Sequence, residues 1–125
     1  MRRNLSWYLP AALWAAFVLF IGSRPYLRPP LRFSGADKLG HAVMYGVLAV
    51  LVVVGGRRSG GRRPWLWALL VVAVVAAGDE LHQRIVPGRD SDILDWAADM
   101  TGALLGVAAV RQLFGKRKRG GSDEP

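Results

Sequence analysis

The chain has 125 residues, enough for one domain, and it carries a formal net charge of +8. It is 52% hydrophobic, and its Arg and Lys residues gather in short segments between apolar runs. This arrangement argues against a nucleic-acid-binding surface and favours a membrane protein, and the absence of Cys excludes disulfides and thiolate metal sites.

The first apolar run follows a short basic start and extends from Leu5 to Ile21. A secretory signal peptide is the alternative, but no small-x-small cleavage motif follows the run. We therefore expect a retained transmembrane helix at about residues 5–22. The next segment, 23–34, contains three Pro and three Arg and is expected to be a loop.

A second helix is expected at about residues 37–54, because Ser34 and Asp37 form an S-x-x-D capping pattern before the next apolar run. Residues 55–64 contain four Gly, four Arg and one Pro, which predicts a turn. A third helix is expected at about 65–85, before Pro87 and Gly88, and a fourth at about 92–114. The tail, 116–125, is basic and then acidic and is expected to be disordered.

These segments predict an all-α fold, a membrane-embedded bundle of four transmembrane helices that forms one domain over residues 1–115. Each apolar block alone is shorter than the ~20 residues of a standard membrane span, so the last three helices reach that length only with their polar ends. A soluble bundle is the alternative, but four such helices leave little polar surface for one.

The distribution of basic residues predicts the orientation. The N-terminus, residues 55–64 and the C-terminal segment together carry eleven Lys and Arg, whereas the remaining polar segments carry six basic and seven acidic residues. The positive-inside rule then predicts a multi-pass membrane protein with N-in, C-in topology and the acidic segments outside.

Charged residues concentrate between Gly78 and Gly102, at the edge of the predicted membrane, where they are costly and tend to mark function. In the fourth helix, three Asp and two Gly recur at spacings of 3, 4, 3 and 4, which places them on one helix face: Asp92, Asp95, Asp99, Gly102 and Gly106. We expect the carboxylates to line a site and the two glycines to let another helix approach closely.

The other helices add polar residues at the same predicted depth. The expected binding residues are Asp37, Lys38, His41, Tyr45, Glu80, Gln83, Arg89, Asp92, Asp95 and Asp99, around a polar, outward-facing pocket. The structural alternatives are helix caps at Asp37 and Asp92, a salt bridge from Arg89 to Asp92 or Asp95, and interhelical hydrogen bonds. Asp99 fits such a role least, because it lies two turns inside an apolar helix.

Two segments of the sequence resemble the VanZ-like family of small bacterial membrane proteins. The first is Asp37-Lys38-x-x-His41-x-x-x-Tyr45-x-x-Leu48, and the second runs from Glu80-x-x-Gln83 through Pro87-Gly88-Arg89, Asp92, Asp95 and Asp99 to Gly102 and Gly106. Asp99 departs from the pattern, because many similar members carry Asn there. The resemblance implies an integral membrane protein of the bacterial envelope, located in the inner (cytoplasmic) membrane. The family's namesake is associated with resistance to the glycopeptide antibiotic teicoplanin.

Three functions are compatible with this site. The preferred one is a binding protein whose outward pocket holds a polar or lipid-linked head group or a glycopeptide. The alternative is a membrane-embedded hydrolase or transferase acting on an envelope lipid, with His41, Glu80 and Asp95 as catalytic candidates, so the sequence leaves open whether the protein is an enzyme. An ion-coupled carrier ranks third, because four short helices without an internal repeat leave little room for alternating access.

No cofactor is expected. A divalent metal held by His41, Glu80 and the Asp residues lacks the support of an H-E-x-x-H spacing, so no metal site is predicted. The expected partners are the lipid bilayer and a lipid-linked cell-wall intermediate or glycopeptide, with oligomer formation left open and no nucleic acid.

Overall fold

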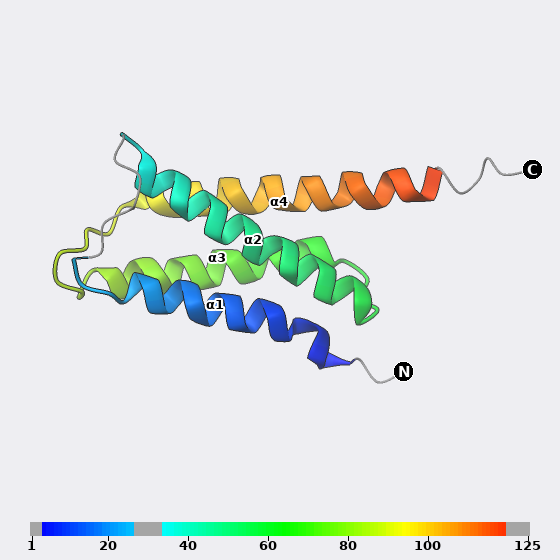
Figure 1. Ribbon diagram of the computed structural model, residues 1–125, viewed down its shortest axis with the longest axis horizontal. Coiled ribbons are helices and arrows are strands. Elements are labelled where there is room, and N and C mark those ends of the chain that lie inside the picture. Colours follow the sequence, from blue (N-terminus) through cyan, green and yellow to red (C-terminus); the bar gives the residue numbers. More distant parts are fainter. Residues whose placement is uncertain (1–3, 27–33, 120–125) are drawn as a thin grey trace, which may run out of the picture.

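The computed structural model describes residues 4–26 and 34–119, which form helices and connecting loops. A short 3-10 turn, Leu5–Tyr8, leads into α1 (Leu9–Gly22), which is followed by α2 (Ala36–Arg58), α3 (Pro64–Gln83) and α4 (Ile93–Arg119). Figure 1 shows the four helices running roughly along one axis, with α2 crossing over its neighbours. The predicted all-α bundle of four helices is confirmed.

All four helices are long and apolar enough to cross a membrane. Their outer faces expose large apolar side chains, among them Phe17 on α1, Leu70 on α3 and Leu104 on α4. Such a surface is unsuited to water but matches lipid tails. The protein is therefore a multi-pass membrane protein.

Helix α2 is the centre of the bundle, because it contacts each of the other three helices and packs most extensively on α4. Its buried face in the middle of the bundle consists of Leu48, Ala49, Val52 and Val53. These side chains meet small residues of the neighbouring helices: Ala68, Val72 and Ala76 of α3, and Ala103, Val107 and Val110 of α4. Small residues let the helix backbones approach closely, which is how helices associate where lipid removes the hydrophobic driving force.

Helices α2 and α4 meet along a glycine seam, formed by Gly46 of α2 and by Gly102 and Gly106 of α4. A Cβ atom at Gly102 would collide with the backbone carbonyl of Ala42, and a Cβ at Gly106 would lie 2.7 Å from the Gly46 carbonyl oxygen. The two backbones are thus in direct contact. A side chain at either α4 position would force the helices apart.

Several helix ends differ from the sequence expectation. Helix α2 is preceded by Gly35 in a left-handed conformation, with φ 84° and no side-chain capping hydrogen bond, so the predicted Ser34 cap is not used. The same helix continues through Gly55 to Arg58, where a turn was expected. A Cβ atom on Gly55 would lie 2.6 Å from the Trp7 carbonyl oxygen, so these glycines serve packing between elements. Helix α4 extends to Arg119, and the rest of the predicted tail lies outside the described residues.

The two ends of the bundle have opposite character. At one end, on the left in Figure 1, α2 and α4 begin and α3 ends, and this acidic end carries the Asp and Glu residues from Asp37 to Asp99. The other end carries the turn between α2 and α3, the start of the 3-10 turn and the far half of α4. It is the basic end, with Arg57, Arg58, Arg62, Arg63 and Arg111.

Candidate functional site

Seven polar side chains from three helices are buried at the acidic end. They form the polar cluster: His41 and Tyr45 of α2, Asp79, Glu80 and Gln83 of α3, and Asp95 and Asp99 of α4. Each helix contributes a pair of residues four positions apart, which places both members of the pair on the face that meets the other helices. A bundle that buries four carboxyl groups in its membrane-crossing part is unusual, because such groups are costly there and need partners.

His41 and Asp99 connect α2 to α4. The Nδ1 atom of His41 lies 2.9 Å from Oδ1 of Asp99, and the Asp99 side chain is fully buried. A carboxylate at this distance accepts the hydrogen bond from Nδ1–H, which leaves the lone pair of the neutral ring on Nε2. The His41 ring also stacks on Tyr45, with ring centroids 6.3 Å apart and planes inclined by 15°. The imidazole is therefore held in one orientation.

Tyr45 and Asp79 connect α2 to α3. The Tyr45 hydroxyl donates a hydrogen bond of 3.0 Å to Oδ2 of Asp79, and both side chains are buried. Asp79 was not among the residues predicted for the site. Its position four residues before Gln83, on the same face of a helix that is otherwise apolar, is the sequence signal that points to it.

Lys38 lies at the rim of the polar cluster and bridges three carboxylates. Its Nζ atom lies 3.1 Å from Oδ1 of Asp95, 3.4 Å from Oδ2 of Asp92 and 3.6 Å from Oδ2 of Asp37. The Asp95 side chain is nearly buried, whereas Asp37 and Asp92 face outward. One ammonium group is thus shared between α2 and α4 and balances only part of the negative charge around it.

Asp92 caps α4, which was one of the alternatives that the sequence left open. Its Oδ1 atom accepts a hydrogen bond of 2.9 Å from the backbone N–H of Leu94. This hydrogen bond, together with the hydrogen bond and charge of Lys38, holds the pKa of the Asp92 carboxyl below its usual range. The carboxylate also faces the positive end of the helix dipole, so it is favourably placed as an anion.

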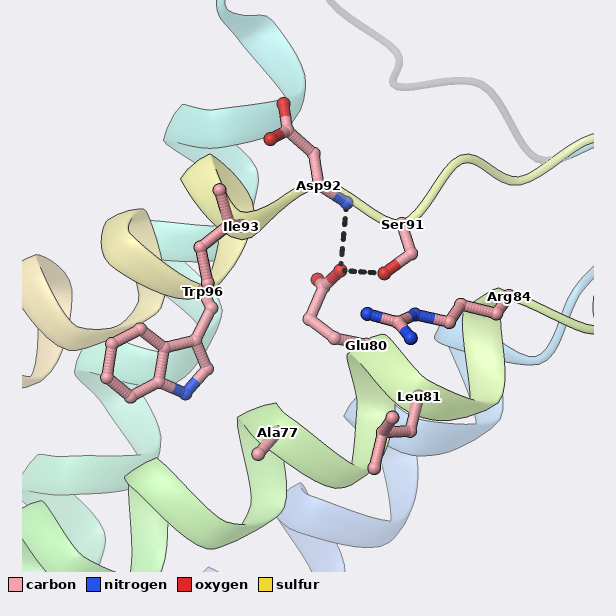
Figure 2. Close-up of a pocket in the computed structure, with 8 residues that line it drawn as sticks. All are labelled: Ala77, Glu80, Leu81, Arg84, Ser91, Asp92, Ile93 and Trp96. Atoms are coloured by element: carbon pink, nitrogen blue, oxygen red, sulfur yellow. Dashed lines mark hydrogen bonds between the residues drawn. The ribbon is translucent and has the colours of Figure 1, made fainter.

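Glu80 ties the end of α3 to the segment that precedes α4. Its Oε2 atom accepts hydrogen bonds from the Ser91 hydroxyl at 3.1 Å and from the Asp92 backbone N–H at 3.2 Å (Figure 2). Glu80 is only 8% exposed. Its carboxylate is therefore fixed by one of its two oxygens, and Ser91 joins the site without any sequence pattern that could have indicated it.

A hollow of about 380 Å³ lies beside the polar cluster, between α3 and the start of α4 (Figure 2). Its apolar wall is formed by Ala77, Leu81, Ile93 and Trp96, and its polar wall by Glu80, Arg84, Ser91 and Asp92. Figure 2 shows the Arg84 side chain lying along the hollow and pointing toward Glu80. Glu80 belongs to both the hollow and the polar cluster, so the two are contiguous.

The predicted binding residues divide between these places. Glu80 and Asp92 line the hollow. The polar cluster contains six of the ten, counting Glu80 again: His41, Tyr45, Glu80, Gln83, Asp95 and Asp99. Lys38 and Asp37 lie at the rim of the cluster. Arg89 is half-buried in the loop after α3, where its backbone N–H donates a hydrogen bond to the Val86 carbonyl at 3.2 Å.

Several polar atoms of the cluster are buried without a partner. Asp79 Oδ1, Glu80 Oε1, Gln83 Nε2 and Asp99 Oδ2 have no hydrogen bond to any residue that the structure describes. Buried polar atoms in native proteins are satisfied by protein groups, ordered water or ions. Four such atoms in one cluster therefore mark a place suited to a water molecule, an ion or a polar ligand group.

The cluster has two chemical capacities. The His41 imidazole is oriented by Asp99 and lies close to Glu80, and an imidazole and a carboxyl group side by side can act as a general acid and a general base. One ligand atom from each of His41, Glu80 and Asp95 also lies within 4.8 Å of the others, a grouping that can hold a metal ion.

Comparison with known proteins identifies the family. No curated protein and no solved structure matches the chain. The profile of the VanZ/LLP1 family matches residues 3–115, which includes all four membrane-crossing segments up to Gly115 and both resembling segments of the sequence. The chain therefore belongs to the VanZ/LLP1 family.

Proposed function

We propose that this protein binds the polar head of an amphipathic molecule of the bacterial cell envelope in the hollow between α3 and α4. The candidates for the ligand are a lipid-linked cell-wall intermediate and a glycopeptide such as teicoplanin, the latter in keeping with the role associated with the family's namesake. The protein would act in the inner membrane, in a binding or antibiotic-resistance role.

The observation that carries the proposal is the two-sided lining of the hollow. Trp96, Leu81 and Ile93 offer apolar surface, while Glu80, Ser91 and Asp92 offer acceptors and a hydroxyl within the same hollow. Ligand pockets combine apolar walls with a few placed polar groups in this way. An acyl or prenyl chain fits the first surface, and sugar hydroxyls or an amine fit the second.

The orientation rests on the charges of the two ends. At the basic end, Arg57 lies over the Phe114 ring at 4.0 Å, Arg58 over Trp7 at 4.8 Å and Arg111 over Trp65 at 5.3 Å. Aromatic rings occur at both membrane interfaces, whereas an excess of arginine is typical of the cytoplasmic one. The acidic end and its hollow would then face the outside, where envelope intermediates and antibiotics are present.

The experiment uses the purified protein in lipid nanodiscs and fluorescently labelled teicoplanin as the probe, with a labelled polyprenyl-diphosphate sugar as a second probe. Ala77→Trp fills the hollow from α3 without altering a residue of the polar cluster. Val74→Trp, on the same helix, 64% exposed and outside the hollow, is the matched control.

We expect at least one probe to bind, Ala77→Trp to weaken its binding by about tenfold or more, and Val74→Trp to leave it unchanged. If neither probe binds, or if both variants bind a probe equally well, the hollow is not the binding site.

A second candidate function, a membrane-embedded hydrolase or transferase, is favoured by the His41–Asp99 pair next to Glu80. In that case Glu80 or His41 would act as general base on a bound envelope lipid. Incubating the nanodiscs with a polyprenyl-diphosphate sugar and following the products by mass spectrometry tests it. Product that forms with the parent protein and not with His41→Gln supports an enzyme, and an unchanged substrate supports a binding protein.

A further inference from the structure

The geometry points to a metal site in the polar cluster, in which His41, Glu80 and Asp95 bind one divalent transition-metal ion of the Zn²⁺ or Mn²⁺ class. The three residues come from α2, α3 and α4, one from each helix. All are more than nine-tenths buried, with exposures of 8%, 8% and 6%. This site shares Glu80 with the hollow, but it does not depend on the ligand proposed for the hollow.

The distances fit an ion. One ligand atom of each residue lies within 4.8 Å of the other two. Two protein atoms that bind the same ion in tetrahedral geometry, each at about 2.1 Å, are separated by about 3.4 Å. Side-chain rotations that shift these atoms by about 1 Å therefore bring His41, Glu80 and Asp95 to ligand geometry.

The hydrogen bond to Asp99 leaves one ring nitrogen of His41 available to a metal ion. Its Nδ1 atom is engaged by Asp99 at 2.9 Å, so Nε2 is the nitrogen that carries a free lone pair. Histidines that bind metals usually donate their other N–H to a carboxylate, which fixes the tautomer and the direction of the ring. Asp99 supplies that support from inside the membrane-crossing part of α4, which gives its buried position a physical reason.

Glu80 presents a second, independent sign of a ligand. While Oε2 is held by Ser91 and Asp92, Oε1 is buried and has no hydrogen bond to any part of the chain that the structure describes. A buried carboxylate oxygen in this state lacks a cation or a donor. A metal ion next to His41 and Asp95 supplies it.

The charge balance leads to the same conclusion. The cluster buries Asp79, Glu80, Asp95 and Asp99, and Lys38, which contacts it at Asp95, is shared with two carboxylates outside the cluster. Buried carboxylates without compensation are strongly unfavourable. A divalent cation would offset part of this negative charge.

The donor set selects the class of ion. One imidazole and two carboxylates suit Zn²⁺ and Mn²⁺, whereas Mg²⁺ and Ca²⁺ prefer sites made of oxygen alone. Three protein ligands leave at least one position for water or another small ligand. Such an open position distinguishes sites that bind or activate a molecule from sites that only hold a fold together.

The test is a metal titration of the tag-free protein in detergent, stripped with EDTA and titrated separately with Zn²⁺ and Mn²⁺ by isothermal calorimetry. We expect one ion per chain. His41→Ala, Glu80→Gln and Asp95→Asn should each weaken binding by about tenfold or more. His82→Ala and Asp90→Asn change the same residue types at exposed positions near the acidic end, so they should bind as the parent does.

Lys38→Met keeps the proposal testable if a ligand variant fails to fold. Its ammonium lies 3.1 Å from Asp95 and competes with a cation, so its removal should tighten binding of the ion several-fold. A misfolded protein cannot show this gain. Three results would each overturn the metal site. They are no binding by the parent at millimolar Zn²⁺ and Mn²⁺, equal losses in the two control variants, and weaker binding by folded Lys38→Met.

Discussion

Asp99 and Gly102 lie one turn apart on the same face of α4, and both meet the same turn of α2. Asp99 Oδ1 is 2.9 Å from His41 Nδ1, while Gly102 touches the backbone of Ala42, the next residue along α2. The close approach of the two backbones at Gly102 is thus what brings the Asp99 carboxylate within hydrogen-bond distance of the imidazole. Packing and polar chemistry are coupled at this point.

Gly102→Ala should separate the two helices and lower stability. Its new Cβ atom would collide with the Ala42 carbonyl, which is backbone and cannot rotate away. We expect a loss of about 1–3 kcal/mol, measured by SDS-induced unfolding followed by circular dichroism. Gly115→Ala is the control, because a Cβ there meets nothing within 4 Å and Ala favours the helix. Equal stabilities of the two variants would mean that the α2–α4 seam is not tight.

Asp99→Asn should be tolerated, whereas Asp99→Ala should not. The Asn amide oxygen still accepts a hydrogen bond from His41 Nδ1, but Ala leaves that donor buried without an acceptor. The expected loss for Ala is about 1–3 kcal/mol in the same unfolding assay. Thr101→Ala, an exposed position on the same helix whose hydroxyl bonds only its own helix at Ala97, is the control. A loss for Asn as large as that for Ala would show that the negative charge itself is required.

Tyr45→Phe should destabilise the junction of α2 and α3. The substitution keeps the ring but removes the hydroxyl that donates to Asp79 Oδ2 at 3.0 Å. The buried carboxylate then loses its donor, at a cost of about 1–3 kcal/mol. In a double-mutant cycle, Asp79→Ala should cost less in the Tyr45→Phe background than in the parent. Strictly additive losses would mean that the two side chains do not interact, and Tyr8→Phe at the basic end serves as the control.

The membrane orientation can be tested with single cysteines, because the chain contains none. Asp90→Cys lies in the exposed loop between α3 and α4, and Arg62→Cys in the exposed turn between α2 and α3. A membrane-impermeant maleimide should label Asp90→Cys in intact cells and Arg62→Cys only after permeabilisation. The reverse pattern would place the acidic end in the cytoplasm and with it the hollow.

The helices were predictable because composition alone determines them in a membrane. Backbone polar groups must be satisfied within each span, so a long apolar segment has to be helical. The close approach at Gly102 was also predictable, because it follows from helical spacing. The continuation of α2 through Gly55 was not, since Gly-Gly-Arg-Arg has the composition of a turn and only the packing against Trp7 explains the helix.

The site was less predictable than the fold. Helical spacing grouped His41 with Tyr45 and Asp95 with Asp99, because these are contacts along one helix. It could not indicate that Tyr45 donates a hydrogen bond to Asp79, or Ser91 to Glu80, because these pairs depend on the rotation of one helix against another. Such rotations are fixed by packing of the whole bundle.

The polar cluster has a consequence for the synthesis of the protein. Asp95 and Asp99 lie in the first two turns of the membrane-crossing part of α4, and a carboxylate inside an isolated span raises the free energy of insertion. The partners of both, Lys38 and His41, are on α2. Since α2 precedes α4 along the chain, the translating ribosome delivers both partners to the membrane before α4 arrives. Helix α4 therefore enters the bilayer alongside α2, and its insertion depends on a helix that is already in place.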